Sequence, residues 1–315
     1  MRQDQGCLTT PILMASREVK VRRFSSFQQF GFLVTLSIAI WWRPLVATFT
    51  LALNNEEYTH LLLILPVSVA LIVLEWKSLK PSVVPSRGVG LVLLASAMVA
   101  CGLSRWTASD LSPAIHLAVY IGALVIWWLG SFVFCFGTRW SLRLMFPLGF
   151  LLCLVPLPEF ALDRIVVLLQ RESAAATRML FTATGVPVMQ DGMFISIPGV
   201  TVEVARECSS IRSSLMLLIT SMVLAHLFLR STWRKTIVVL AAIPLSVAKN
   251  AVRIFTLSML GVHVDMGFLH GTLHRRGGIV FFILALLAVL LLLWVLGRGE
   301  KKTSRDLDQP VLQQS

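Results

Sequence analysis

The chain has 315 residues, of which 56% are hydrophobic and only 14% are charged, and its mean hydropathy is +0.79. Soluble domains carry about 25% charged residues, so this composition excludes the soluble class and indicates an integral membrane protein. The net charge of +12 comes without any nucleic-acid-binding motif. Most basic residues lie in short loops, which is the pattern of membrane topology signals.

The first 27 residues are polar and basic and lack a short apolar core followed by a small-residue cleavage site. We therefore predict a cytoplasmic tail there and no signal peptide. Residues 28–297 form the predicted multi-pass membrane domain. Residues 298–315 form a second polar cytoplasmic tail, which we expect to be disordered.

About eight apolar runs come close to the length of roughly 20 residues that a helix needs to cross a bilayer. In chain order they are roughly Phe30–Leu53, His60–Glu75, Gly88–Leu103, Ala114–Phe136, Leu142–Pro158, Ser209–Leu229, Thr236–Leu260 and Gly278–Leu296. Alternate loops are basic and nearly free of acidic residues, as the positive-inside rule requires. This alternation predicts that both termini lie in the cytoplasm.

One long segment, from Glu159 to Glu207, falls on the extracytoplasmic side in this topology. Residues 160–185 have apolar positions at helical spacing and predict an amphipathic helix at the membrane interface, ended by Gly185 and Pro187. The sequence "MFISIPGVTVEV" alternates and predicts a short hairpin. We thus expect an all-α integral membrane protein with a helix/strand cap before the sixth span.

Only one of the five cysteines has polar and charged neighbours on both sides, namely Cys208 in "EVARECSSIRSS". The other four are Cys7 in the polar tail, and Cys101, Cys135 and Cys153 in apolar runs, where a thiol usually behaves as a small hydrophobe. The cysteines form no CxxC pair and have no histidine at ligand spacing. We therefore expect no metal and no cofactor.

Three reactive side chains are expected at one depth of the membrane. Cys208 begins the sixth span, and His274 directly precedes the last. Arg253 lies 18 residues beyond Lys235, or about 27 Å along a helix, near the outer edge of a hydrocarbon core of about 30 Å. A cation or histidine favours the thiolate, histidine transfers protons, and arginine stabilises an oxyanion. Together these groups suit acyl transfer through a thioester.

Further polar residues are candidates for supporting roles at this site. Lys249 and Asn250 share a helix face with Arg253, and His270 competes with His274 for the role of acid/base. His60 lies at the outer end of the second span. The alternative readings remain a packed thiol for Cys208, an arginine that reaches the lipid headgroups, and interfacial loop histidines.

The pattern resembles the exosortase/archaeosortase family of membrane transpeptidases. The resemblance lies in "EVARECSSIRSS", in "KNAVRI", in "LHRRGGIVFFILAL" and in the earlier "EEYTHLLLILPVSVALIVLEW". It implies that Cys208 is the nucleophile, Arg253 the oxyanion or substrate-positioning group, and His274 the acid/base. The chain departs from the family at Ser210, where glycine is common, and at Glu207, a further candidate supporting residue that stands where a smaller one is usual.

The resemblance also implies the substrate and the location. Such enzymes act at the extracytoplasmic face of the cell (inner) membrane on exported proteins that end in a PEP-CTERM-like sorting tail. That tail consists of a short motif, a transmembrane helix and a basic cluster. Membrane lipid is the other expected partner, nucleic acid is not expected, and the acceptor is unknown. Three alternatives stay open: an endopeptidase without transfer, a transporter or channel, and a non-catalytic assembly factor.

Overall fold

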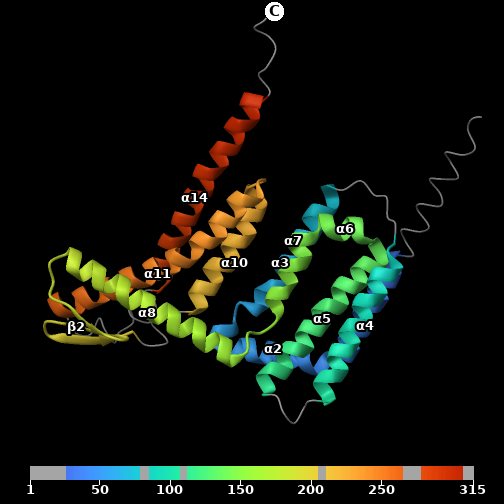
Figure 1. Ribbon diagram of the computed structural model, residues 1–315, viewed down its shortest axis with the longest axis horizontal. Coiled ribbons are helices and arrows are strands. Elements are labelled where there is room, and N and C mark those ends of the chain that lie inside the picture. The colour runs from blue at the N-terminus through green and yellow to red at the C-terminus, as the bar shows by residue number, and fades with distance from the viewer. Residues whose placement is uncertain (1–25, 79–84, 107–111, 205–210, 265–277, 308–315) are drawn as a thin grey trace, which may run out of the picture. The chain divides into compact units, whose positions relative to one another are not determined.

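The computed structural model describes residues 26–78, 85–106, 112–204, 211–264 and 278–307. Contacts divide the chain after Glu159 into two compact units, which are described one at a time. Both units consist mainly of helices (Figure 1), and the only strands among the described residues belong to the second unit.

The first predicted span, Phe30–Leu53, is a bent pair of helices in the structure. The structure has a helix Ser26–Ile40 and then α2 (Trp42–Asn54), and the two are bent by 73°. Pro44 explains the break, because a proline ring clashes with the carbonyl four residues earlier, which here belongs to Ile40. Trp41 fills the bend and is only 1% exposed, with its ring 5.7 Å from that of Trp127.

The second span is confirmed as a helix. A short 3₁₀ turn, η1 (Glu56–Tyr58), leads into α3 (Leu61–Ser78). The side chain of Asn55 accepts a hydrogen bond from the backbone N–H of Glu57 at 3.0 Å, which caps the turn. The hydroxyl of Tyr58 donates to the carbonyl of Leu157 at 2.9 Å, so this turn is tied to the C-terminal end of the same unit.

The third and fourth spans are confirmed as α4 (Arg87–Trp106) and α5 (Pro113–Phe136), which pack side by side (Figure 1). Their backbones approach closely at two glycines. A methyl group added at Gly90 would lie 2.5 Å from the Cα of Phe134, and one at Gly130 would lie 3.1 Å from the backbone nitrogen of Leu94. Small residues permit such close packing of membrane helices.

Gly90→Ala is therefore expected to destabilise the protein, by about 1–3 kcal/mol, because a methyl group there can fit only if the backbones move apart. Gly102→Ala is the matched control, since Gly102 lies on the same helix with nothing within 4 Å of an added methyl group. Thermal unfolding of both variants in detergent, followed by circular dichroism, measures the difference. Equal melting temperatures for the two variants would contradict the close packing.

The fifth predicted span, Leu142–Pro158, is not a single helix. The structure has three short pieces there, α6 (Thr138–Arg143), α7 (Met145–Phe150) and the 3₁₀ helix η2 (Leu151–Leu154). Proline and glycine within the run disfavour a regular helix. The apolar side chains of this run pack inside the protein: Leu148, Phe150, Leu151 and Leu154 are buried.

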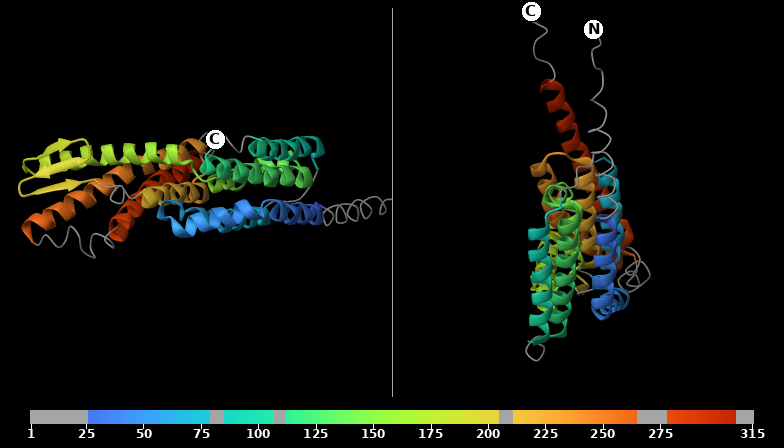
Figure 2. Two further views of the ribbon diagram at one scale, coloured as in Figure 1. Left: turned by 90° about the horizontal axis from the view of Figure 1, so that it is seen from below. Right: turned by 90° about the vertical axis from the view of Figure 1, so that its right-hand side faces the viewer.

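The predicted amphipathic helix of the second unit is confirmed as α8 (Glu159–Ala183), and Gly185 adopts a positive φ of 74° just after it. The predicted hairpin is confirmed as β2 (Phe194–Ile197) and β3 (Val200–Glu203), with Gly199 at the turn. β1 (Met189–Asp191) adds a third antiparallel strand. The left view of Figure 2 shows the strands beside α8 and α11.

The other described helices of the second unit are α10 (Ile211–Phe228), α11 (Thr232–His263) and α14 (Gly278–Leu307), which pack against one another (Figure 1). They share an apolar core that includes Leu217, Val238 and Val289. A second cluster joins α8, the sheet and α11 through Phe181, Ile195 and Ile254. α11 thus packs against the bundle through residues before Lys249 and against the cap through residues after it.

The C-terminal tail corrects a further expectation, because α14 continues to Leu307 where disorder was predicted from residue 298. After Gly299 the tail is rich in lysine, arginine, glutamate and leucine, which favour helix. Proline is absent from the tail until Pro310.

Six described helices are long and apolar enough to cross a membrane, and the number rises to eight if each of two bent helix pairs forms one span. The bent pairs are the two N-terminal helices and the pair Met145–Leu154 with Glu159–Ala183. The predicted number of about eight spans falls within this range, and the predicted all-α membrane architecture with a helix and strand cap agrees with the structure.

Candidate functional site

Three of the predicted site residues lie together on α11. Lys249, Asn250 and Arg253 are only 7%, 1% and 8% exposed, although all three are strongly polar. We call them the α11 polar face. Buried polar side chains in a membrane helix are expensive and usually functional. Cys208, Glu207, His270 and His274 lie outside the described residues, so their predicted roles remain predictions.

Lys249 connects the α11 polar face to the start of α10. Its ammonium group donates a hydrogen bond to the hydroxyl of Ser213, which lies in the first turn of α10 and five residues after Cys208 in the sequence. Ser214, the next residue, is 8% exposed. The helix that follows the cysteine therefore begins against the α11 polar face.

Arg253 connects the same face to the start of α14. A methyl group added at Gly278 would lie 3.7 Å from Nη1 of Arg253, so the guanidinium group lies against the first residue of α14. Gly278 follows His274 by four residues. Because Arg253 is only 8% exposed, its side chain does not extend freely into a headgroup layer as the alternative reading of this residue requires.

Asn250 connects the α11 polar face to α8. Its side-chain nitrogen donates a hydrogen bond to the hydroxyl of Ser173 at 3.1 Å, and Ser173 is itself 1% exposed. Among the described residues, the side-chain oxygen of Asn250 has no hydrogen-bond partner although it is buried. A buried unsatisfied polar atom costs about 1–3 kcal/mol of stability.

α8 also holds the chain that leads to Cys208, and sequence reasoning missed this contact. The side-chain amide of Gln170 donates to the carbonyl of Val204 at 2.8 Å, across 34 residues. Gln170 and Ser173 are both buried and lie three positions apart, on one face of α8. We call these two residues the α8 polar face. The spacing of two uncharged polar residues on an amphipathic helix was the available signal, but it is also typical of a solvated surface.

The arrangement concentrates positive potential at one place. An ammonium group, a guanidinium group and the starts of α10 and α14 meet there, and neither helix has an acidic residue in its first turn. Helix N-termini carry about half a positive charge and bind anions through free N–H groups. Such a site can stabilise a thiolate and the oxyanion of a tetrahedral intermediate.

His60 belongs to the first unit and is 7% exposed. Its Nδ1 lies 3.1 Å from the carbonyl oxygen of Glu57, and Tyr58 beside it is 7% exposed. The ring is therefore held by the turn that begins the second span. Within the described residues, no group of three or more histidine, cysteine, aspartate or glutamate side chains could hold a metal ion.

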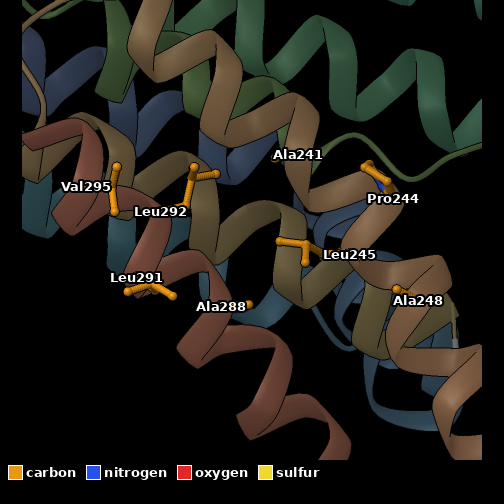
Figure 3. A pocket seen from close by; sticks show the side chains of 8 residues that line it. All are labelled: Ala241, Pro244, Leu245, Ala248, Ala288, Leu291, Leu292 and Val295. Atoms are coloured by element: carbon orange, nitrogen blue, oxygen red, sulfur yellow. The ribbon is translucent and has the colours of Figure 1, made fainter.

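A hollow of about 540 Å³ lies between α11 and α14 (Figure 3). Figure 3 shows four side chains from each helix around it, and all of them are apolar: Ala241, Pro244, Leu245, Ala248, Ala288, Leu291, Leu292 and Val295. On α11 the hollow adjoins the polar face, because Lys249 lies four residues, or one helical turn, beyond Leu245 of the lining. No polar side chain lines the hollow, so the hollow does not extend the α11 polar face.

Comparison with known protein families identifies a family for this chain. The sequence model described as transmembrane exosortase (Exosortase_EpsH) matches residues 41–291. The matched region begins at the bend before α2 and ends within α14, so it covers most of each unit and the whole α11 polar face. No curated protein and no solved structure gives a match.

Proposed function

The chain belongs to the transmembrane exosortase family, and from this membership we propose that it cleaves the C-terminal sorting tail of exported proteins through a thioester on Cys208. The family match makes the chain a multi-pass membrane protein with a transpeptidase-type function. The tail, the thioester and the residues that act on them are our proposal.

The observation that carries the proposal is the convergence of two helix starts on the α11 polar face. α10 begins three residues after Cys208, and its Ser213 is bonded to Lys249. α14 begins four residues after His274, and its first residue lies against Arg253. A chain extends at most about 3.6 Å per residue, so Cys208 and His274 are covalently tied to within about 11 and 14 Å of these two helix starts.

The proposed reaction has two acyl transfers. His274 takes the proton of the Cys208 thiol, and the thiolate attacks the carbonyl carbon of the scissile bond. Arg253 stabilises the resulting oxyanion. When the intermediate collapses, His274 returns the proton to the leaving amine, the tail departs, and the rest of the substrate stays on Cys208 as a thioester. An amine or hydroxyl acceptor, or water, then attacks the thioester and frees the thiol.

The substrate class follows from the proposed topology. With both termini in the cytoplasm, Cys208 and Arg253 lie at the extracytoplasmic surface of the cell (inner) membrane. A substrate whose transmembrane helix is followed by a basic cluster has its basic end inside, by the same rule. Its scissile bond, on the other side of that helix, then lies at the depth of Cys208. Exported proteins with such tails and membrane lipid are the proposed partners.

The apolar hollow argues against a transporter or channel. An ion path through the α11 polar face should continue as polar positions along the helix, yet the adjoining hollow is lined by apolar side chains. An endopeptidase without transfer uses the same residues and differs only in the final acceptor. If the chain were a non-catalytic assembly factor, its function would not require the thiol of Cys208.

A tail-processing assay tests the proposal. The protein is co-expressed with membrane-anchored proteins from the same genome that end in a helix followed by basic residues, and their sizes are followed. We expect tail loss with the wild type. Tail loss should be much lower with His274→Ala than with His270→Ala. The mass of the product distinguishes the acceptors: a free carboxylate indicates hydrolysis, and added acceptor mass indicates transfer. Intact tails on every candidate would argue against the proposed substrate class.

A further inference from the structure

We propose that the hollow between α11 and α14 is a binding site for an anionic phospholipid. Its apolar part holds an acyl chain, and two arginines beyond one end of it, Arg234 and Arg298, bind the phosphate of the headgroup. We call these two residues the arginine pair. The proposal goes beyond the proposed function and does not depend on it, since no residue of the α11 polar face belongs to this site.

The hollow has the composition and the length of an acyl-chain site. On each helix its lining residues follow the spacing i, i+3, i+4 and i+7, from Ala241 to Ala248 on α11 and from Ala288 to Val295 on α14 (Figure 3). Each of these stripes extends about 10 Å along its helix. Three of the eight lining residues are alanines, whose short side chains leave the space. The volume of about 540 Å³ falls within the range of about 300–1,000 Å³ for small-ligand sites.

The hollow opens at the outer surface of the helices. Leu291 and Val295 line it and are nonetheless 60% and 52% exposed. Both α11 and α14 are long and apolar enough to cross a membrane, so this exposed side faces lipid tails and not water. A ligand that enters from the side therefore comes from the bilayer.

The arginine pair lies just beyond one end of the hollow. Arg234 reaches from α11 to α14, where its Nη1 donates to the carbonyl of Leu296 at 2.6 Å, and Leu296 directly follows Val295 of the lining. Arg298 lies three residues beyond Val295 on the same face of α14. It is exposed, and its guanidinium carbon lies 3.5 Å from the centre of the Trp294 ring. Each helix thus places one positive charge where a phosphate would follow its acyl chain.

The distance along α11 fits one leaflet of a bilayer. Ala248, at the far end of the hollow, lies 14 residues beyond Arg234, which is about 21 Å along a helix. A bilayer with its headgroup regions is about 40–45 Å thick, so one leaflet takes up about half of that. A lipid whose phosphate lies at the arginine pair can therefore extend its chain along the whole hollow.

Charge decides between the two occupants that an apolar groove in a membrane can have. In the predicted topology the arginine pair lies at the cytoplasmic surface. A substrate helix of the proposed class has its basic cluster on that side, and the arginine pair would repel it. A phospholipid has a phosphate there, and basic pockets between membrane helices on the cytoplasmic side bind anionic headgroups. The occupant that fits both parts of the site is an anionic phospholipid of the cytoplasmic leaflet.

Two kinds of variant separate the apolar part from the charged part, and neither leaves a buried polar group without a partner. The double variant Ala248→Leu with Ala288→Leu fills the hollow with apolar side chains, and Ala95→Leu, at an exposed position of α4, is its control. Arg298→Gln removes an exposed charge. Its control is Arg143→Gln, which removes an exposed charge from the last turn of α6, on the same predicted side of the membrane.

Native mass spectrometry of the full-length protein in mild detergent measures the apparent dissociation constants of phosphatidylglycerol and phosphatidylcholine. We expect the wild type to bind phosphatidylglycerol about tenfold more tightly, because two arginines face its anionic headgroup. Arg298→Gln should weaken phosphatidylglycerol binding about fivefold and leave phosphatidylcholine binding unchanged. The hollow-filling variant should weaken the binding of both lipids about tenfold, because CH₂ groups of the chain lose their burial. Both controls should match the wild type, and all melting temperatures should agree.

A photoreactive label shows where the lipid lies. Phosphatidylglycerol with a diazirine in its acyl chain, placed in vesicles with the protein, should label the peptides that contain residues 241–248 and 288–295, and the hollow-filling variant should lose this label. Equal affinity for the two lipids would overturn the proposal, as would an effect of Arg298→Gln no larger than that of Arg143→Gln. Displacement of the label by an apolar helical peptide with a basic C-terminal cluster would also overturn it, and would assign the hollow to a substrate helix.

Discussion

Replacement of Cys208 by alanine should abolish tail cleavage, lowering kcat/KM by at least about 10³-fold, because an enzyme that has lost its nucleophile keeps only weak residual catalysis. No neighbouring hydroxyl can fully substitute for the thiol. Ser209 and Ser210 follow directly in the sequence, but a hydroxyl is far less acidic than a thiol and needs stronger activation by a base.

The measurement for Cys208 compares the size of a tail-bearing substrate in membranes that hold equal amounts of each variant. Cys101→Ala is the matched control, since Cys101 is a free, partly exposed thiol on α4, and processing by it should equal that of the wild type. Continued tail loss with Cys208→Ala would show that the thiol is not the nucleophile. It would also revive the reading of Cys208 as a packed side chain.

Arg253→Ala should have the second-largest effect, a loss of about 10²–10³ in kcat, which is the usual cost of removing a group that stabilises an oxyanion. Arg253→Lys should recover part of this loss. Lysine keeps the charge but presents a single point donor and not the planar fork of the guanidinium group. In the structure this fork lies against the first residue of α14, where a shorter ammonium group would sit differently.

Steady-state kinetics of processing in detergent separates the two roles that Arg253 can have. The expected result is a fall in kcat with little change in KM. A rise in KM with kcat unchanged would contradict oxyanion stabilisation and assign substrate binding instead. Arg105→Ala is the control, because Arg105 is an exposed cation in the last turn of α4 and its loss should leave both constants unchanged.

Much of the helical fold could be predicted from hydropathy alone. The apolar runs that became α4, α5, α10, α11 and α14 are uninterrupted by charge over most of their length, and such runs must be helical in a bilayer to satisfy their backbone groups. The hairpin β2–β3 was equally clear, since alternation and the Pro198–Gly199 turn are both local signals. The sequence separation of interacting residues is small in every one of these elements.

The errors occurred where tertiary packing decides the local structure. The bend at Trp41 depends on the clash caused by Pro44 and on the contact of Trp41 with Trp127, which is distant in the sequence. The run 142–158 is apolar because its residues are buried in pieces, and hydropathy does not distinguish a buried segment from a span. The helix beyond residue 298 was missed because the polar composition of the tail was taken as a sign of disorder.

The site was predictable only in part. The α11 polar face follows from helical spacing, and the structure confirms that Lys249, Asn250 and Arg253 are buried on one helix. Gln170 and Ser173 were not predicted, because their partners Val204 and Asn250 are 34 and 77 residues away. Polar positions on an amphipathic helix normally face solvent, so only the fold reveals that these two face the interior.

The thioester intermediate tests the central claim most directly. The purified protein is mixed with a tail-bearing substrate, stopped in acid and digested, and the peptide that contains Cys208 is examined by mass spectrometry. The account predicts that this peptide carries the C-terminal fragment of the processed substrate, that hydroxylamine releases the adduct, and that Cys208→Ala never forms it. Tail cleavage that proceeds without any adduct on Cys208, when the reaction is stopped before completion and the acceptor is withheld, would contradict catalysis through this cysteine.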